Sequence, residues 1–200
     1  YVISSFISIK LSTNTTKKKK DEKLIGDGKE TKVEEDNCNV TVNGHGGQVP
    51  AKDAAIYVGS AGTAARFLAA FLGLSEGTHY MDASAQMRKR PMGPLLKTLT
   101  GIGTSFLFDG HFPFAVTGAG LLIDTSDNEK KRIDVSVNIN DSSQFLSALL
   151  ISLGAYAGES VIRVEGTHGM AYIDMTVRMM EQFGIKVQSE NSVYKIAKQG

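Results

Sequence analysis

Four stretches of the chain carry apolar residues at helical spacing, and each is followed by a short strand-like run. The stretches 66–72 and 144–150 are apolar on nearly every side, which predicts two helices that are buried all round. The stretches 92–103 and 173–184 are more polar. In 173–184 the apolar positions share one face, which predicts a helix that packs on a sheet from one side. Helices thus alternate with short strands, as in an α/β (α+β) domain.

The pattern repeats along the chain with a spacing close to 80 residues. Helix 66–72 corresponds to helix 144–150, and helix 92–103 corresponds to helix 173–184. The strand-like runs that accompany these helices are 78–82, 104–108, 160–164 and 185–187. Similarity at a fixed period indicates duplicated supersecondary units, each with a helix, a strand, a helix and two strands. Residues 30–43 are interpreted as the closing strands of an earlier unit.

The last helix permits a detailed prediction of burial. Its apolar face, expected in the core, consists of Ile173, Val177, Met180 and Phe183. Met175 and Met179 are interpreted, together with Met180, as flexible side chains that fill the core. Gly184 follows the last periodic residue and suits the left-handed position that ends many helices.

Composition limits the class of protein without identifying it. With 42% hydrophobic and 22% charged residues, the chain has the balance of a soluble globular protein. A net charge of +1 gives no reason to expect a nucleic-acid partner, and the lysine run 17–20 is interpreted as part of a solvated loop at 12–30. No apolar run reaches the roughly 20 residues that cross a bilayer, so no membrane partner is expected. The single cysteine, Cys38, excludes an internal disulfide and fits a reducing, cytoplasmic location.

Residues 59–66 have the composition of an anion-binding turn. Two glycines, Gly59 and Gly62, let the backbone approach a ligand closely, and a helix follows. Free N–H groups at a helix start suit phosphate or carboxylate ligands. Ser60 or Thr63 is expected to cap this helix.

A basic cluster at 88–93 precedes the next helix. We expect Pro91 in the first turn of that helix, which places Arg90 just before its N-terminus. A guanidinium there joins the helix dipole in holding a carboxylate or phosphate. Arg88 and Lys89 are expected to be solvated surface residues.

A third helix start carries two serines. Ser142 and Ser143, between Asp141 and Gln144, open helix 144–150, the counterpart in the next repeat of the helix that follows the glycine turn. Their hydroxyls suit a phosphate, and the simpler alternative is capping by Asp141 or Ser142. Equivalent helix starts are expected to lie near each other on one face. The four histidines show no metal-ligand spacing, so neither a metal nor a cofactor is expected.

Four motifs together resemble the enolpyruvyl transferase family, most closely its 5-enolpyruvylshikimate-3-phosphate synthase branch. They occur in the family's order at 59–66, 87–95, 141–150 and 172–176. The resemblance implies βαβαββ units around a pseudo-threefold axis, which form one domain of a two-domain fold. It also implies that residues 1–200 are a single domain of the N-terminal type, in which 1–36 match poorly and lack the family's lysine- and serine-containing motif.

By this resemblance, the chain carries about half of a transferase active site of the shikimate pathway, which serves aromatic amino-acid biosynthesis. The enolpyruvyl group of phosphoenolpyruvate would move onto shikimate 3-phosphate, with release of phosphate. Arg90 and Gln144 are the implied catalytic residues. The implied substrate-binding residues are Gly62, Thr63, Arg66, Arg90, Ser142, Ser143, Gln144 and Tyr172, of which Arg66 acts least directly. The second domain of the same enzyme is the implied partner.

Two alternatives stay open. A sister enzyme transfers enolpyruvate to UDP-N-acetylglucosamine and usually carries a reactive cysteine five residues before the arginine of the Arg-Pro pair, where this chain has Ala85. The other alternative is an isolated, catalytically inactive binding domain. We expect the chain alone to bind shikimate 3-phosphate weakly or not at all and not to turn over. The residues Gly169, Met170 and Ala171 also replace a more polar lead-in to Tyr172, so one phosphate-binding hydroxyl is lost.

Overall fold

The computed structural model describes residues 51–107, 111–122 and 131–197, together with Val49 and four short strands near the N-terminus. Those strands are β1 (Ile7–Ser8), β2 (Val33–Glu34), β3 (Asn39–Val40) and β4 (Asn43–Gly44). Strands β2 and β3 pair in antiparallel fashion, as do β1 and β4. The β2–β3 hairpin agrees with the closing strands expected at 30–43. The predicted loop at 12–30 and Cys38 lie outside the described residues.

The remaining elements form two consecutive units. The first contains β5 (Asp53–Tyr57), α1 (Gly62–Leu74), β6 (Thr78–Asp82), α2 (Ala85–Arg88), α3 (Gly93–Thr100), β7 (Ser105–Leu107) and β8 (Phe114–Thr117). The second contains β9 (Ile133–Asn138), α4 (Gln144–Gly154), β10 (Ser160–Glu165), α5 (Met170–Gln182), β11 (Val187–Glu190) and β12 (Val193–Ile196). Apart from the short α2, both have the order βαβαββ.

The two sheets have the same topology, which confirms the repeat. Their strand orders are β5-β6-β8-β7 and β9-β10-β12-β11. In each sheet the first two strands are parallel, and the closing hairpin adds two antiparallel strands beside the second. A parallel pair requires a crossover, which α1 supplies in one unit and α4 in the other.

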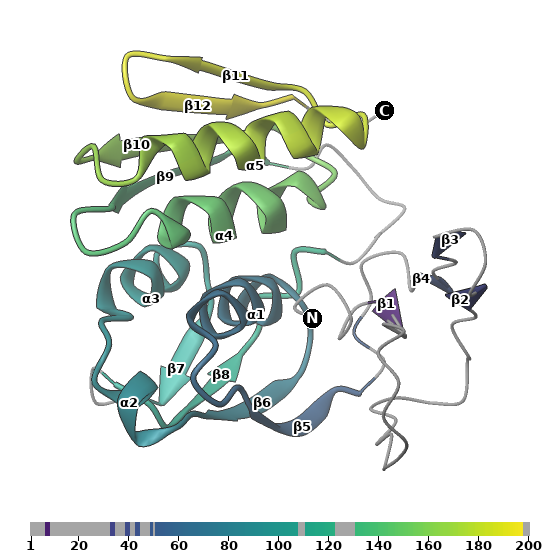
Figure 1. Ribbon diagram of the computed structural model, residues 1–200, viewed down its shortest axis with the longest axis vertical. Helices are drawn as coiled ribbons and strands as arrows, with labels where there is room; N and C mark the ends of the chain where they lie inside the picture. Colours follow the sequence, from purple (N-terminus) through teal and green to yellow (C-terminus); the bar gives the residue numbers. More distant parts are fainter. Residues whose placement is uncertain are drawn as a thin grey trace.

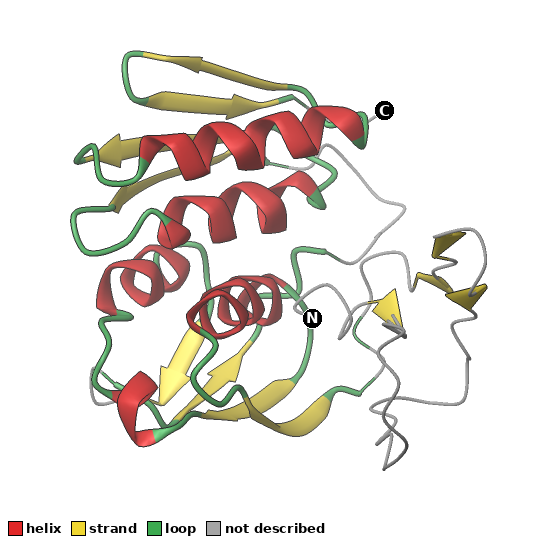
Figure 2. Ribbon diagram, viewed as in Figure 1, coloured by secondary structure: helices red, strands yellow, loops and turns green. Residues whose placement is uncertain are grey.

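The helices α1, α3 and α4 lie between the two sheets (Figures 1 and 2). Helices α1 and α4 contact each other directly, as expected for helices that are apolar on nearly every side. Their leucines are almost fully buried: Leu68, Leu72, Leu146, Leu149 and Leu150. Because each buried leucine contributes about 1.5–3 kcal/mol by leaving water, this contact holds the starts of α1 and α4 in fixed positions.

Helix α5 packs with fewer apolar residues than predicted. Ile173 and Met180 are buried, whereas Phe183, Met175 and Met179 are 78%, 59% and 51% exposed. Their predicted burial is therefore wrong. Met175 and Met179 are two and six positions beyond Ile173, which places them on the opposite side of a 3.6-residue helix. Phe183 is the residue that ends the helix, after its last periodic turn.

The end of α5 explains why the next strand begins later than predicted. Gly184 has φ +84°, in the left-handed region predicted for it. Its N–H donates to the carbonyl of Glu181, and the N–H of Ile185 donates to the carbonyl of Met180. These two bonds form a Schellman motif. Because the helix end uses the amide of Ile185, strand β11 begins only at Val187.

His79 gives the fold a predicted sensitivity to acid. It lies on β6 with 1% of its surface exposed, and burial lowers the pKa of its imidazole below the ordinary value of 6.5. The unfolded chain therefore binds a proton more readily than the folded chain, so the free energy of unfolding falls as pH drops below about 6.5. Urea unfolding at pH 8 and pH 5.5 measures this loss. We expect His79→Leu to reduce the difference in the free energy of unfolding between pH 8 and pH 5.5. The exposed-site control His168→Leu is expected to leave this difference unchanged. An equal difference in both variants would contradict the prediction.

Candidate active site

Three helix N-termini meet on one face of the molecule. The side-chain nitrogen Nε2 of Gln144, at the start of α4, donates to Oγ1 of Thr63, at the start of α1, over 2.9 Å. Gly169, just before α5, lies so close to Ser143 that a Cβ built on it would be 2.6 Å from the serine Oγ. The positive end of the helix dipole favours anions at each start, and the starts of α1 and α5 have no side-chain cap. The predicted proximity of the α1 and α4 starts is confirmed.

The glycine turn leaves the start of α1 without a side-chain cap. Gly59 follows β5 with φ +57°, and α1 begins at Gly62 after the uncapped residue Ala61. The predicted capping by Ser60 or Thr63 is wrong, because both hydroxyls have other partners. Ser60 Oγ hydrogen-bonds Ser84 Oγ at 2.7 Å, and Thr63 accepts from Gln144. The first amides of α1 are thus not occupied by a capping side chain.

Gly62 lies between two guanidinium groups. A Cβ built on it would be 2.6 Å from Nη1 of Arg90 and 2.7 Å from Nη1 of Arg66. Real Cβ atoms do not approach other atoms so closely. A residue without a side chain is therefore what allows both arginines to reach the start of α1.

Arg90 is fixed differently from the prediction. Helix α2 ends at Arg88 and α3 begins at Gly93, with Pro94 rather than Pro91 in its first turn. Pro91 thus lies between the two helices, and the predicted position of Pro91 is wrong. The Arg90 side chain is exposed, yet its Nη1 lies beside Gly62. Both halves of the sequence-predicted anion site are therefore adjacent in space.

Arg88 has the surface role that was predicted for it. Its Nη2 donates to a carboxylate oxygen of Asp82 at 2.7 Å, and this contact holds the pKa of the Asp82 carboxyl below its usual value. Lys89 is exposed. Arg90 therefore remains as the cation of this cluster that reaches the helix start.

The paired serines lie beneath the same face. Ser142 and Ser143 are 8% and 6% exposed, and Oγ of Ser142 accepts from the backbone N–H of Gln144 over 3.3 Å. Capping by Ser142 is thus present, whereas Asp141 is exposed and the residue before α4, Ser143, makes no capping bond with its side chain.

Tyr172 stands at the edge of this face. It lies in the first turn of α5 and is 67% exposed. A Cβ built on Gly169 would lie 3.6 Å from its Cδ2 atom and 2.6 Å from Ser143 Oγ. The tyrosine ring and Ser143 therefore lie near each other across Gly169.

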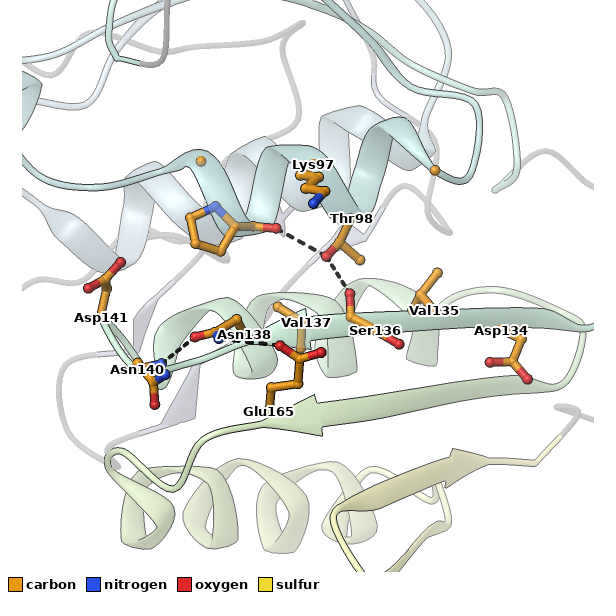
Figure 3. A pocket seen from close by; sticks show the side chains of 13 residues that line it. Lys97, Thr98, Asp134, Val135, Ser136, Val137, Asn138, Asn140, Asp141 and Glu165 are labelled. Atoms are coloured by element: carbon orange, nitrogen blue, oxygen red, sulfur yellow. Dashed lines mark hydrogen bonds between the residues drawn. The ribbon is translucent and has the colours of Figure 1, made fainter.

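A groove of about 820 Å³ lies between α3 and β9, beside this face. Thr98 spans it, with its hydroxyl placed between the carbonyls of Pro94 and Ser136 (Figure 3). Its charged lining consists of Lys97, Asp134, Asp141 and Glu165. Asp134 pairs with Arg132 and Arg163, and the two other carboxylates outnumber the single ammonium, so this lining does not favour an anion.

The described residues hold no group of three or more His, Cys, Asp or Glu side chains that could bind a metal. Over the same part of the chain, none of the helices has the length and apolar character needed to cross a membrane.

A family model described as EPSP synthase (3-phosphoshikimate 1-carboxyvinyltransferase) matches residues 27–200. The chain belongs to this family. The match contains all four motifs and begins within the segment 1–36. Its members among solved structures include the EPSP synthase from Acinetobacter baumannii, which is 26% identical with a TM-score of 0.63 over 85% of this chain and 36% of that chain. The enolpyruvyl transferase fold expected for this chain is thereby confirmed.

Curated relatives agree with this assignment. The 3-phosphoshikimate 1-carboxyvinyltransferase of Nostoc sp. is 35% identical over 164 residues, which cover 80% of this chain and 36% of the relative. The pentafunctional AROM polypeptide of Eremothecium gossypii is 37% identical over 169 residues, covering 79% of this chain and 10% of the relative. The chain thus spans about a third of the length of the bacterial relatives.

Gly169, part of the lead-in to Tyr172 that differs from the family pattern, has a crowded and left-handed position in the structure. Gly169 has φ +66°, and a Cβ there would collide with Ser143. We expect Gly169→Ser to lower the free energy of unfolding by about 1–3 kcal/mol, from the left-handed backbone and the crowding combined. Chemical denaturation measures the loss. Gly184→Ser serves as the control, since it has φ +84° but nothing within 4 Å of its Cβ position; an equal loss in both variants would contradict the crowding at Ser143.

Proposed function

We propose that this chain forms one wall of an active site that transfers the enolpyruvyl group from phosphoenolpyruvate to shikimate 3-phosphate. The observation that carries the proposal is that Arg90 lies beside Gly62 at the start of α1. At the same place Gln144, the first residue of α4, hydrogen-bonds Thr63. No carboxylate among the described residues pairs with either arginine beside Gly62. A site with uncompensated cations and free amides suits two anionic substrates.

The two ends of the face have different proposed ligands. Phosphoenolpyruvate lies against the amide of Gly62 and the guanidinium of Arg90. Shikimate 3-phosphate lies against Ser142 and Ser143, with Tyr172 and Thr63 lining its pocket. Gln144 lies between the two ends, since its amide already contacts the start of α1.

In the proposed reaction, the 5-hydroxyl oxygen of shikimate 3-phosphate loses its proton and bonds to the phosphate-bearing carbon of phosphoenolpyruvate, while the methylene carbon gains a proton, which gives a tetrahedral intermediate. Loss of a proton from the resulting methyl group then re-forms the double bond as the bond to phosphate breaks and inorganic phosphate leaves. Arg90 and the Gly62 amide hold the two anions together and stabilise the charge that develops on the departing phosphate. The second domain of the enzyme contributes the groups that move protons, along with the opposite wall of the cleft.

The alternative acceptor, UDP-N-acetylglucosamine, has no support from the site. The position that carries a cysteine in that sister enzyme is Ala85, the first residue of α2. Its methyl group cannot act as a thiol nucleophile. A reducing, cytoplasmic location is part of the proposal, as is catalytic inactivity of the 200-residue chain by itself.

A chimera tests the proposed function. Residues 27–200 replace the matching segment of the Nostoc sp. relative, which supplies the rest of the polypeptide. We expect the chimera to release phosphate from phosphoenolpyruvate only when shikimate 3-phosphate is present. UDP-N-acetylglucosamine is the control acceptor. A folded chimera that releases phosphate with neither acceptor, or only with the nucleotide sugar, would overturn the proposal.

A further inference from the structure

Arg66 is almost fully buried, with 1% of its surface exposed, although it carries a charge. Its Nη1 donates to the carbonyl of Gly62 at 3.1 Å and to Oε1 of Gln144 at 3.2 Å. Its Nη2 donates to the carbonyl of Pro91 at 3.1 Å. The guanidinium also lies over the ring of Phe145, 5.4 Å from the centroid. All three hydrogen-bond acceptors are uncharged, and no carboxylate of the described residues forms an ion pair with it.

This arrangement carries a cost in stability. Burial lowers the pKa of Arg66 to about 10, with a further contribution from the charge of Arg90, so the side chain stays protonated at neutral pH. Its Nε is buried without a hydrogen-bond partner. A buried cation without a carboxylate is costly. Stability alone therefore gives no reason for an arginine at this position.

The contact with Gln144 determines which way its amide points. A guanidinium has donors and no acceptor, so the atom of Gln144 that faces Arg66 is the oxygen. The nitrogen Nε2 must then face the other way, where it donates one hydrogen to Thr63. Its second hydrogen is available to a ligand on the helix-start face. With the amide reversed, a carbonyl oxygen would face the anions instead.

The contact with Pro91 fixes the segment between α2 and α3, which carries Arg90. Pro91 directly follows Arg90 in the segment between α2 and α3, where the N–H of Arg90 donates to the carbonyl of Met87 at the end of α2. A bond from Nη2 to the Pro91 carbonyl ties this segment to α1. The backbone of Arg90 is thereby held at a place from which its side chain reaches Gly62.

We infer that Arg66 is a positioning residue, which orients the Gln144 amide nitrogen and the Arg90 side chain toward the substrates without touching them. The inference rests on the proposed function. One rigid, planar group makes all three bonds at once, and two of them diverge from the same Nη1 atom. A lysine has a single nitrogen on a flexible stem and cannot reproduce this geometry.

The side-chain amide signals of Gln144 provide a test in the full 200-residue chain. They are identified by their absence from the NMR spectrum of Gln144→Leu. In Arg66→Lys we expect them to move toward the positions of exposed glutamines such as Gln182, and the affinity for phosphoenolpyruvate to fall about tenfold, as for loss of a hydrogen bond to a charged group. Arg178→Lys, on an exposed part of α5, is the control. Unchanged Gln144 signals in a folded Arg66→Lys variant would overturn the inference.

A second variant decides the matter if Arg66→Lys fails to fold. Gln144→Glu keeps the acceptor for Arg66 but removes the N–H donor and adds a negative charge. We expect a melting temperature no lower than that of the unmodified chain, because the buried cation gains a carboxylate, together with at least about tenfold weaker phosphoenolpyruvate binding. Gln182→Glu is its matched control. Unaltered binding by Gln144→Glu would contradict the inference.

The two readouts separate this inference from the proposed function. If the folded chimera fails to use phosphoenolpyruvate, the proposed function is wrong, whereas the Gln144 signals of the 200-residue chain still report whether Arg66 orients the amide. If the chimera is active and the Gln144 signals do not depend on Arg66, the positioning role is wrong and the function stands.

Discussion

Arg90→Ala is expected to lower kcat/KM for phosphoenolpyruvate about 10²- to 10³-fold in the chimera, the usual cost of losing one preorganised donor to developing charge. The melting temperature is expected to stay within about 2 °C, because substitutions of exposed side chains change stability by less than about 0.5 kcal/mol. Arg90 is exposed, and its side chain makes no hydrogen bond or ion pair with the described residues. Arg90 is therefore expected to contribute to the use of the substrate rather than to the stability of the fold.

Steady-state kinetics and thermal unfolding of the same preparation check both parts of this prediction. Lys89→Ala is the matched control, since Lys89 is a neighbouring exposed cation without a role in the site. We expect it to behave like the unmodified chimera in both measurements. A large fall in melting temperature combined with intact use of phosphoenolpyruvate would show that Arg90 is structural.

Periodicity was sufficient to predict the repeat and the proximity of the starts of α1 and α4. Apolar spacing identified α1 and α4 as buried helices, and the 80-residue repeat placed their N-termini on one face. The structure confirms this through a hydrogen bond between Gln144 and Thr63, which are 81 positions apart. A repeat predicts such proximity because equivalent residues of neighbouring units lie near their common interface.

The network around Arg66 could not be predicted in the same way. Its acceptors are two backbone carbonyls and one amide oxygen, and the chemical character of a carbonyl does not depend on residue type.

The error at Pro91 has a related cause. Two prolines lie within four residues, and both Pro91 and Pro94 are compatible with a first helical turn. In the structure Pro94 occupies the first turn of α3.

Gly62→Ala is expected to raise the KM for phosphoenolpyruvate about 10²-fold in the chimera, the scale associated with displacing a site by about 1 Å. The added methyl group would lie 2.6 Å from Nη1 of Arg90 and 2.7 Å from Nη1 of Arg66. Both atoms are the ends of long side chains, and Arg90 is free to move into solvent. The expected loss is therefore mainly in substrate binding, with a smaller loss of stability.

Gly93→Ala provides the matched control for this substitution. Gly93 is also the first residue of its helix, α3, and a Cβ there meets nothing within 4 Å. The exchange is expected to leave kinetics unchanged and to raise stability slightly, since alanine is the better helix former. If Gly62→Ala also keeps the original KM, the binding of phosphoenolpyruvate does not depend on the spacing between Arg90 and the start of α1. The site would then bind its anion through groups other than the Gly62–Arg90 pair. If the KM rises only in Gly62→Ala, the close approach of Arg90 to an uncovered helix start is what selects phosphoenolpyruvate.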